Sequence, residues 1–244
     1  TTAVTVGSGA TFNVNTRTDT IGSLAGAGAV TLGTGGVLTT GDATNTTFSG
    51  IISGTGNVTK QGSGTMTLSG DNTSTGTFQV NAGTLALGAS NVFANSSTLA
   101  LNGGTFAVGG NFSDTIGNLS LLASSTLNFQ NNTGNLTFTD ATRTAGTLTI
   151  DNWSGNPSGA GKSQLIFTNN PLAAVLTNTN FTGYGTGAIR LASGEIVPNT
   201  GGTIYTTTGT SAIAWGTAAN WSPTGFAQNV GDTAILGSSI TSTS

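Results

Sequence analysis

The glycine-rich stretch GAGKS, residues 159–163, contains residue types that could hold a phosphate group. A Walker A loop requires a further glycine five positions before its Gly-Lys-Ser, and here that position is occupied by Asn156. Such a loop must also open a helix, because N–H groups and the dipole at the helix N-terminus hold the phosphate. Instead, Gln164 to Phe167 alternates polar and apolar residues and predicts a strand. We therefore predict a polar loop between two strands and no nucleotide partner.

The densest group of ionisable residues consists of Asp140, Arg143, Asp151 and Lys162. If one coil of a β-helix separated Asp140 from Asp151, the two carboxylates could bind Ca²⁺ or divide the acid and base roles of a polysaccharide-acting enzyme. Aspartate also caps turns routinely, and both residues follow short alternating runs. We favour turn caps, so we predict no catalytic residue, no cofactor and no metal site. The single glutamate, Glu195, is expected to be structural.

The composition argues against several other function classes. The chain of 244 residues has no His and no Cys, which removes the residues of most hydrolase triads and zinc sites. It has 5 Lys+Arg and a net charge of −3, too little positive charge to neutralise a run of phosphates, so we predict no nucleic-acid partner. No apolar run approaches the roughly 18 residues of a membrane-spanning helix, and we predict no transmembrane span.

The elements that must position these residues are short strands. Apolar residues recur at every second position in runs of four to six, which predicts half-buried strands separated by Gly, Asn or Asp. Only 171–176, PLAAVL, offers one helical turn. Similar phrases recur along the chain, as they do in solenoids, so we favour an all-β parallel β-helix (β-solenoid) of roughly ten coils over a sandwich. The runs are TFNVN (11–15), AVTLG (29–33), NVTKQG (57–62), TMTLSG (65–70), TFQVN (77–81), TLALG (84–88), TLALN (98–102), TFAVG (105–109), TLNFQ (126–130), NLTFTD (135–140) and TLTID (147–151).

Residues 47–88 closely resemble the autotransporter-associated β-strand repeat, a passenger-like family of bacterial secreted β-helices. Ser74 stands where the family has an aromatic residue, and the resemblance implies that Lys60 points outward. The matching positions are Gly54, Gly56, Lys60, Gly62, Gly64, Leu68, Gly70, Asn72, Gly76, Val80, Gly83 and Leu85.

Two further segments resemble companions of that repeat in large secreted bacterial proteins. Residues 147–198 are similar to a module that closes such a unit, and the phrase AWGTAANWSPTGFAQNVGDTAIL (214–236) is similar to the start of a next unit. The sequence therefore predicts a β-solenoid over 1–200. The terminal segment, 201–244, is predicted to be a cap or an inter-subunit contact.

The resemblance and the composition together favour a non-catalytic structural protein that is secreted to the bacterial cell surface. Both ends of the predicted solenoid read as uncharged strands, and open strand edges seek partners. We therefore expect copies of the chain to join head to tail into filaments, a surface layer or an adhesive array. The residues assigned to this contact are Val4, Val6, Trp215, Trp221 and Ile240.

Two other functions remain open at this point. A monomeric adhesin could bind surface glycans through an aromatic face formed by Trp215, Trp221, Tyr184 and Tyr205. The weaker alternative is a polysaccharide-acting β-helix enzyme that uses the Asp140 neighbourhood.

Overall fold

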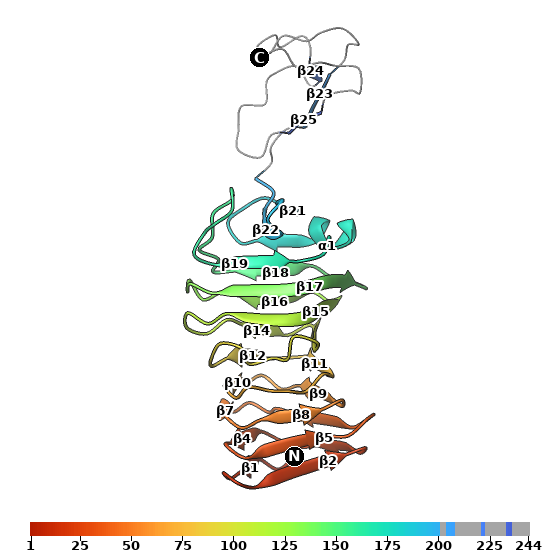
Figure 1. The fold of residues 1–244 in the computed structure, drawn as a ribbon, viewed down its shortest axis with the longest axis vertical. Coiled ribbons are helices and arrows are strands. Elements are labelled where there is room, and N and C mark those ends of the chain that lie inside the picture. The colour runs from red at the N-terminus through yellow and green to blue at the C-terminus, as the bar shows by residue number, and fades with distance from the viewer. Residues whose placement is uncertain (201–203, 208–220, 223–232, 236–244) are drawn as a thin grey trace. The chain divides into compact units, whose positions relative to one another are not determined.

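The computed structural model describes residues 1–200, 204–207, 221–222 and 233–235. The chain divides into two compact units, Thr1–Pro198 and Asn199–Ser244. In the first unit the chain winds in successive coils that stack along one axis (Figure 1). Strands of consecutive coils pair in parallel, which confirms the predicted parallel β-solenoid.

Two sheets run along the solenoid, and a third sheet of three strands covers only its N-terminal part. The first sheet, in spatial order, holds β1 (Val4–Val6), β4 (Leu24–Gly26), β7 (Thr46–Phe48), β10 (Thr65–Leu68), β12 (Thr84–Leu87), β14 (Thr105–Ala107), β16 (Ser125–Asn128), β18 (Leu148–Asp151) and β20 (Thr179–Phe181). The second holds β3 (Thr18–Thr20), β6 (Val37–Thr40), β9 (Asn57–Lys60), β11 (Thr77–Val80), β13 (Thr98–Asn102), β15 (Asp114–Ala123), β17 (Asn135–Arg143), β19 (Gln164–Phe167), β22 (Glu195–Pro198) and β21 (Ala188–Arg190). The third holds β2 (Thr11–Asn15), β5 (Ala29–Leu32) and β8 (Ile52–Gly54).

The stack has about seven turns, fewer than the roughly ten coils that the sequence predicts. Val4 pairs with Leu24 and Leu127 pairs with Ile150, so a coil is about 20 to 23 residues long. The predicted number of coils was too high because it assumed that the whole chain winds into coils. Parallel winding stops at β19 and β20, after which the chain reverses its direction.

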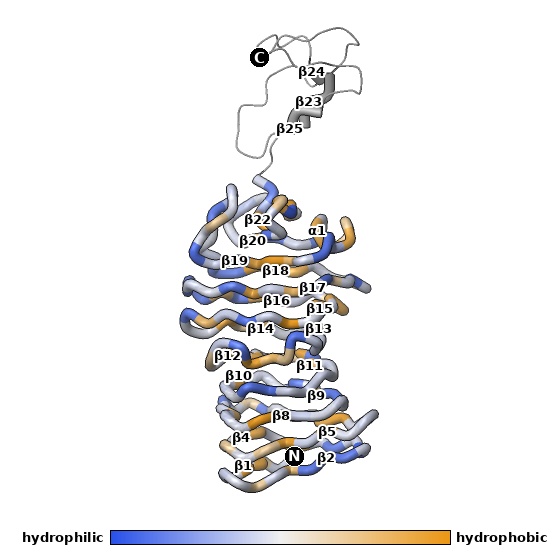
Figure 2. The backbone as a smooth tube through the Cα atoms, viewed as in Figure 1, coloured by the Kyte–Doolittle hydropathy of each residue, from blue (hydrophilic) through white to orange (hydrophobic). Residues whose placement is uncertain are grey.

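Alternation along the strands builds the core. In β10 and β11, buried Met66, Leu68, Phe78 and Val80 alternate with half-buried polar residues, and the buried positions lie in register from coil to coil. The same alternation of apolar and polar positions is visible along the backbone in Figure 2. Inward side chains of successive coils thus form continuous apolar ladders, and each coil is stabilised by the coils on either side of it.

Glycine is required at one corner because neighbouring backbones approach closely there. A Cβ added at Gly50 would collide with the carbonyl oxygen of Gly28, and one added at Gly70 would collide with that of Gly50. The column Gly28–Gly50–Gly70 therefore lets three successive coils turn at van der Waals distance from one another.

The C-terminal end of the stack is covered by the chain itself. β22 pairs antiparallel with β19, and β21 pairs antiparallel with β22. The one predicted helical turn is confirmed as α1 (Ala173–Thr177), which lies against β17, β20 and β21. The expectation that both ends are open is thus wrong at this end, because an antiparallel hairpin takes up the free edge of β19.

The described residues of the second unit form three short strands, β23 (Ile204–Thr207), β24 (Trp221–Ser222) and β25 (Thr233–Ile235). β23 pairs antiparallel with β24 and parallel with β25. In the described part of the chain, no helix is both long enough and apolar enough to cross a membrane.

Candidate functional site

The GAGKS stretch forms a loop, and its geometry does not suit a phosphate. Gly159 and Ala160 both adopt positive φ, and the loop runs directly into β19 with no intervening helix. Its backbone is attached to the hairpin that covers the end, because the amide of Ala160 donates to Glu195 Oε2 at 2.8 Å. The predicted polar loop between two strands is therefore confirmed, and no helix N-terminus is present here to hold a phosphate.

Asp140 and Asp151 are not brought together. Asp140 lies in β17 of the second sheet, whereas Asp151 ends β18 of the first sheet. Asp151 precedes a turn as expected, with Asn152 at φ 49°. The turn expected at Asp140 is wrong, because β17 continues to Arg143, and the Asp140 carboxylate accepts the adjacent amide of Ala141 at 2.7 Å. No group of three or more metal-ligating residues occurs among the described residues.

Lys60 points inward, which overturns the expectation that it faces solvent. Its side chain is 2% exposed, and Nζ donates to the carbonyl oxygens of Gln61 at 2.7 Å, Gly62 at 2.9 Å and Ala82 at 3.3 Å. Burial lowers the pKa of the Lys60 ammonium, and the nearby Asp42 carboxylate partly opposes this shift. The ammonium satisfies carbonyls of two successive coils at one corner, which is a structural role.

A second set of inward polar residues connects coils on another corner. Asn72 Oδ1 accepts the amide of Ile52 at 2.7 Å, and its Nδ2 donates to the carbonyl of Val92 at 2.9 Å. Asp114 continues the column, because its Oδ2 accepts the amides of Val92 at 2.8 Å and Phe93 at 3.1 Å. These side chains bond backbone groups that the strand ladders leave unpaired.

Asp114 is the acid of this column, and its pKa is shifted by its surroundings. It is 3% exposed, and its Oδ1 is buried without a hydrogen-bond partner among the described residues. Burial raises the pKa of Asp114 to about 6, and the nearby Asp71 carboxylate adds to the rise, while the amides of Phe93 and Val92 oppose it. The sequence interpretation did not single out Asp114, because an isolated aspartate before a strand resembles an ordinary turn residue.

The hairpin at the C-terminal end carries two charged residues. Arg190 Nη2 donates to the carbonyl oxygens of Phe167 at 2.9 Å and Thr168 at 3.2 Å, at the end of β19. Glu195 is 3% exposed and also accepts Gln164 Nε2 at 3.3 Å. The structural role predicted for Glu195 agrees with these contacts. Together the two side chains attach the hairpin to the final coil.

The residues assigned to assembly fall into two groups. Val4 is half-buried and Val6 is buried in β1, which is the first strand of its sheet and therefore an edge strand. Trp215 and Ile240 lie outside the described residues. Trp221 begins β24, where its backbone pairs with Thr207, and its side chain is not described.

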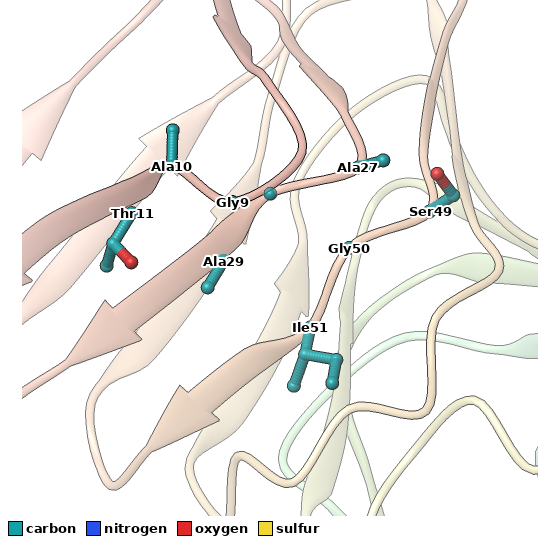
Figure 3. A pocket seen from close by; sticks show the side chains of 9 residues that line it. Gly9, Ala10, Thr11, Ala27, Ala29, Ser49, Gly50 and Ile51 are labelled. Carbon is teal, nitrogen blue, oxygen red and sulfur yellow. The ribbon is translucent and has the colours of Figure 1, made fainter.

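A groove of about 350 Å³ lies at the corner of the three N-terminal coils, lined by residues 9–11, 27–29 and 49–51 (Figure 3). Its only polar side chains are the hydroxyls of Thr11 and Ser49, and Ile51 is 48% exposed beside them. No ionisable side chain lines the groove, so it has no group that could act as an acid or a base.

The predicted aromatic face is only partly described. Tyr184 is 43% exposed and packs edge-on against Trp153, with ring centroids 5.9 Å apart. Tyr205 lies in β23, and its side chain is not described. The sequence interpretation missed Trp153, because it treated the NWSG phrase only as part of a module that resembles others.

The passenger-associated-transport-repeat family model matches residues 58–87. This segment lies within the predicted repeat, 47–88, and spans β9 to β12, including Lys60 and Asn72. The resemblance to an autotransporter-associated repeat is thereby confirmed for this part of the chain. The comparisons with curated proteins and with solved structures give no match.

Proposed function

We propose that the chain is a non-catalytic structural rod of a bacterial secreted passenger, displayed at the cell surface, and that copies join end to end. The observation that supports the rod most directly is the unbroken parallel pairing from β1 to β20 in one sheet, which makes the first unit, Thr1–Pro198, one elongated stack. The passenger-associated repeat at 58–87 supports secretion. The separation of Asp140 and Asp151 onto two sheets argues against a carboxylate pair that cleaves polysaccharide.

The joining surface that we propose is the edge formed by β1, β2 and β3, each of which stands at the end of its sheet. In β1 the amide of Val4 donates inward to the carbonyl of Ser23 at 2.8 Å. Since successive amides of a strand point to opposite sides, the amide of Thr5 points to the open edge. An added strand would pair there by backbone bonds, as in β-augmentation.

The partner on the neighbouring copy is proposed to be its segment 201–244, which contains Trp215, Trp221 and Ile240. The stacked coils of the neighbour offer a poorer partner, because the β21–β22 hairpin already pairs with β19. Contact between unlike surfaces of identical copies does not close on itself and yields filaments.

Thr5→Pro tests the joining surface. Proline removes the outward N–H of β1 and is tolerated on sheet edges, so the inward bonds to β4 should persist. Sedimentation velocity and electron microscopy over a range of concentrations should show growing end-to-end polymers for the unmodified chain, and single rods for Thr5→Pro.

Thr5→Val is the matched control, because it keeps the N–H and a β-branched side chain. It should assemble like the unmodified chain. Single rods of the unmodified chain at every concentration would refute the joining of copies, and so would unchanged polymers of a folded Thr5→Pro variant.

A further inference from the structure

An aromatic cluster lies at the C-terminal end of the solenoid. Trp153 follows β18 and packs edge-on against Phe181 of β20, with ring centroids 4.7 Å apart. It also packs edge-on against Tyr184, which lies in the turn after β20, with ring centroids 5.9 Å apart. Phe181 is buried, Trp153 is half-buried and Tyr184 is exposed. The segment 182–186 around Tyr184 is exposed throughout, and a Cβ at Gly183 would meet no atom within 4 Å. The cluster is therefore anchored in the core at one side and open at the other.

Polar residues precede Trp153 at the end of β18. Asn152, which is exposed, donates from Nδ2 to Asn128 Oδ1 at 3.1 Å and to Asp151 Oδ2 at 3.4 Å. Asp151 lies in register with Asn128 on the outward side of the first sheet. Asp151 and Asn152 immediately precede Trp153 in the chain, and with Asn128 they offer both donors and acceptors.

We propose that Trp153, Tyr184, Asp151 and Asn152 form a binding site for a neutral glycan. Aromatic side chains that combine an apolar ring with a polar tip suit partners with both apolar C–H faces and hydroxyl groups, which is the chemistry of a sugar ring. The Asp151 carboxylate would repel a uronate or a sialic acid, which favours an uncharged sugar.

None of these residues belongs to the surfaces proposed for end-to-end joining, because they come from β18, β20 and their following turns, whereas the joint is proposed to use β1, β2, β3 and segment 201–244. The test begins with an array of neutral glucan, mannan and galactan oligosaccharides beside uronate oligosaccharides. The best neutral oligosaccharide is then titrated by calorimetry. Tyr184→Ala should weaken binding about tenfold, the effect of losing one aromatic contact.

Two further variants separate stacking from general damage. Tyr184→Phe keeps the ring and should stay within about threefold of the unmodified affinity, because only a hydroxyl is lost. Leu172→Ala removes another exposed apolar side chain, 60% exposed and outside the cluster, and should bind like the unmodified chain. Circular dichroism and thermal unfolding should be unchanged for all three variants.

Binding of a neutral glycan that is lost in Tyr184→Ala and kept in the other two variants supports the site. The proposal is overturned if no neutral glycan binds at millimolar concentration, if uronates bind more tightly, or if folded Tyr184→Ala binds like the unmodified chain. The assembly assays above do not depend on any of these results, so the two proposals can fail separately.

Discussion

Asp114→Asn should stabilise the solenoid at neutral pH and change its dependence on pH. The folded chain holds Asp114 with a pKa of about 6, above its ordinary value of 3.8. Between these two values the folded chain binds more protons at this carboxyl than the unfolded chain does. The free energy of unfolding therefore falls as the pH rises through this window, and the favourable contribution is lost above about pH 6.

The magnitude follows from the shift. A rise of about 2 pKa units at 1.36 kcal/mol each corresponds to about 3 kcal/mol between pH 4 and pH 8. Asparagine removes the buried charge but keeps an oxygen for the amides of Val92 and Phe93. Asn72 already performs this role elsewhere in the column. Asp114→Asn should consequently match the unmodified chain near pH 4 and exceed it by about 3 kcal/mol near pH 8.

Urea unfolding followed by circular dichroism at pH 4, 5, 6, 7 and 8 provides the measurement. The difference in the free energy of unfolding between the variant and the unmodified chain isolates the contribution of Asp114, because the other acids contribute equally to both. Ser120→Ala, on the outward side of the same strand, is the control and should give a difference that does not vary with pH. A difference for Asp114→Asn that stays constant from pH 4 to pH 8 would refute the reasoning.

Two other substitutions test the corners of the solenoid by the same unfolding measurement. Lys60→Met should destabilise by about 2 kcal/mol, because three partly buried carbonyls lose their charged donor; an unchanged midpoint would contradict this role. Gly50→Ala should destabilise by more than about 2 kcal/mol, because its Cβ would collide with the carbonyl of Gly28. Gly7→Ala, where a Cβ meets nothing within 4 Å, should change stability by less than about 0.5 kcal/mol, and equal effects at the two glycines would refute the close approach.

Most strands could be predicted because their alternation survives without interruption. The run TFQVN at 77–81 became β11 and TMTLSG at 65–70 contains β10. The longest strand, β15, was not predicted. Gly117 and Asn118 interrupt its pattern, and the adjacent Leu121 and Leu122 break the period of two, so tertiary pairing with β13 and β17 decided the outcome.

The antiparallel hairpin at the C-terminal end could not be deduced from repetition, because a solenoid pattern carries no information about where winding stops. A local signal was nevertheless present. Residues 188–190 and 195–198 form two short runs separated by four residues, and the intervening Gly194 has φ 91°. A short loop containing glycine between two such runs is typical of a hairpin. The resemblance of 147–198 to a closing module remains a prediction.

The inward positions of Lys60 and Asp114 were available from the alternation alone. Lys60 lies two residues after Val58 and Asp114 two residues before Ile116, and both apolar residues are buried. Period two therefore placed both charges inside, against the general preference of charged residues for solvent. Both stand at the end of a strand, where the chain turns and backbone groups leave the ladder. A charged side chain can enter a solenoid at such a position because the corner supplies the carbonyls or amides that satisfy it.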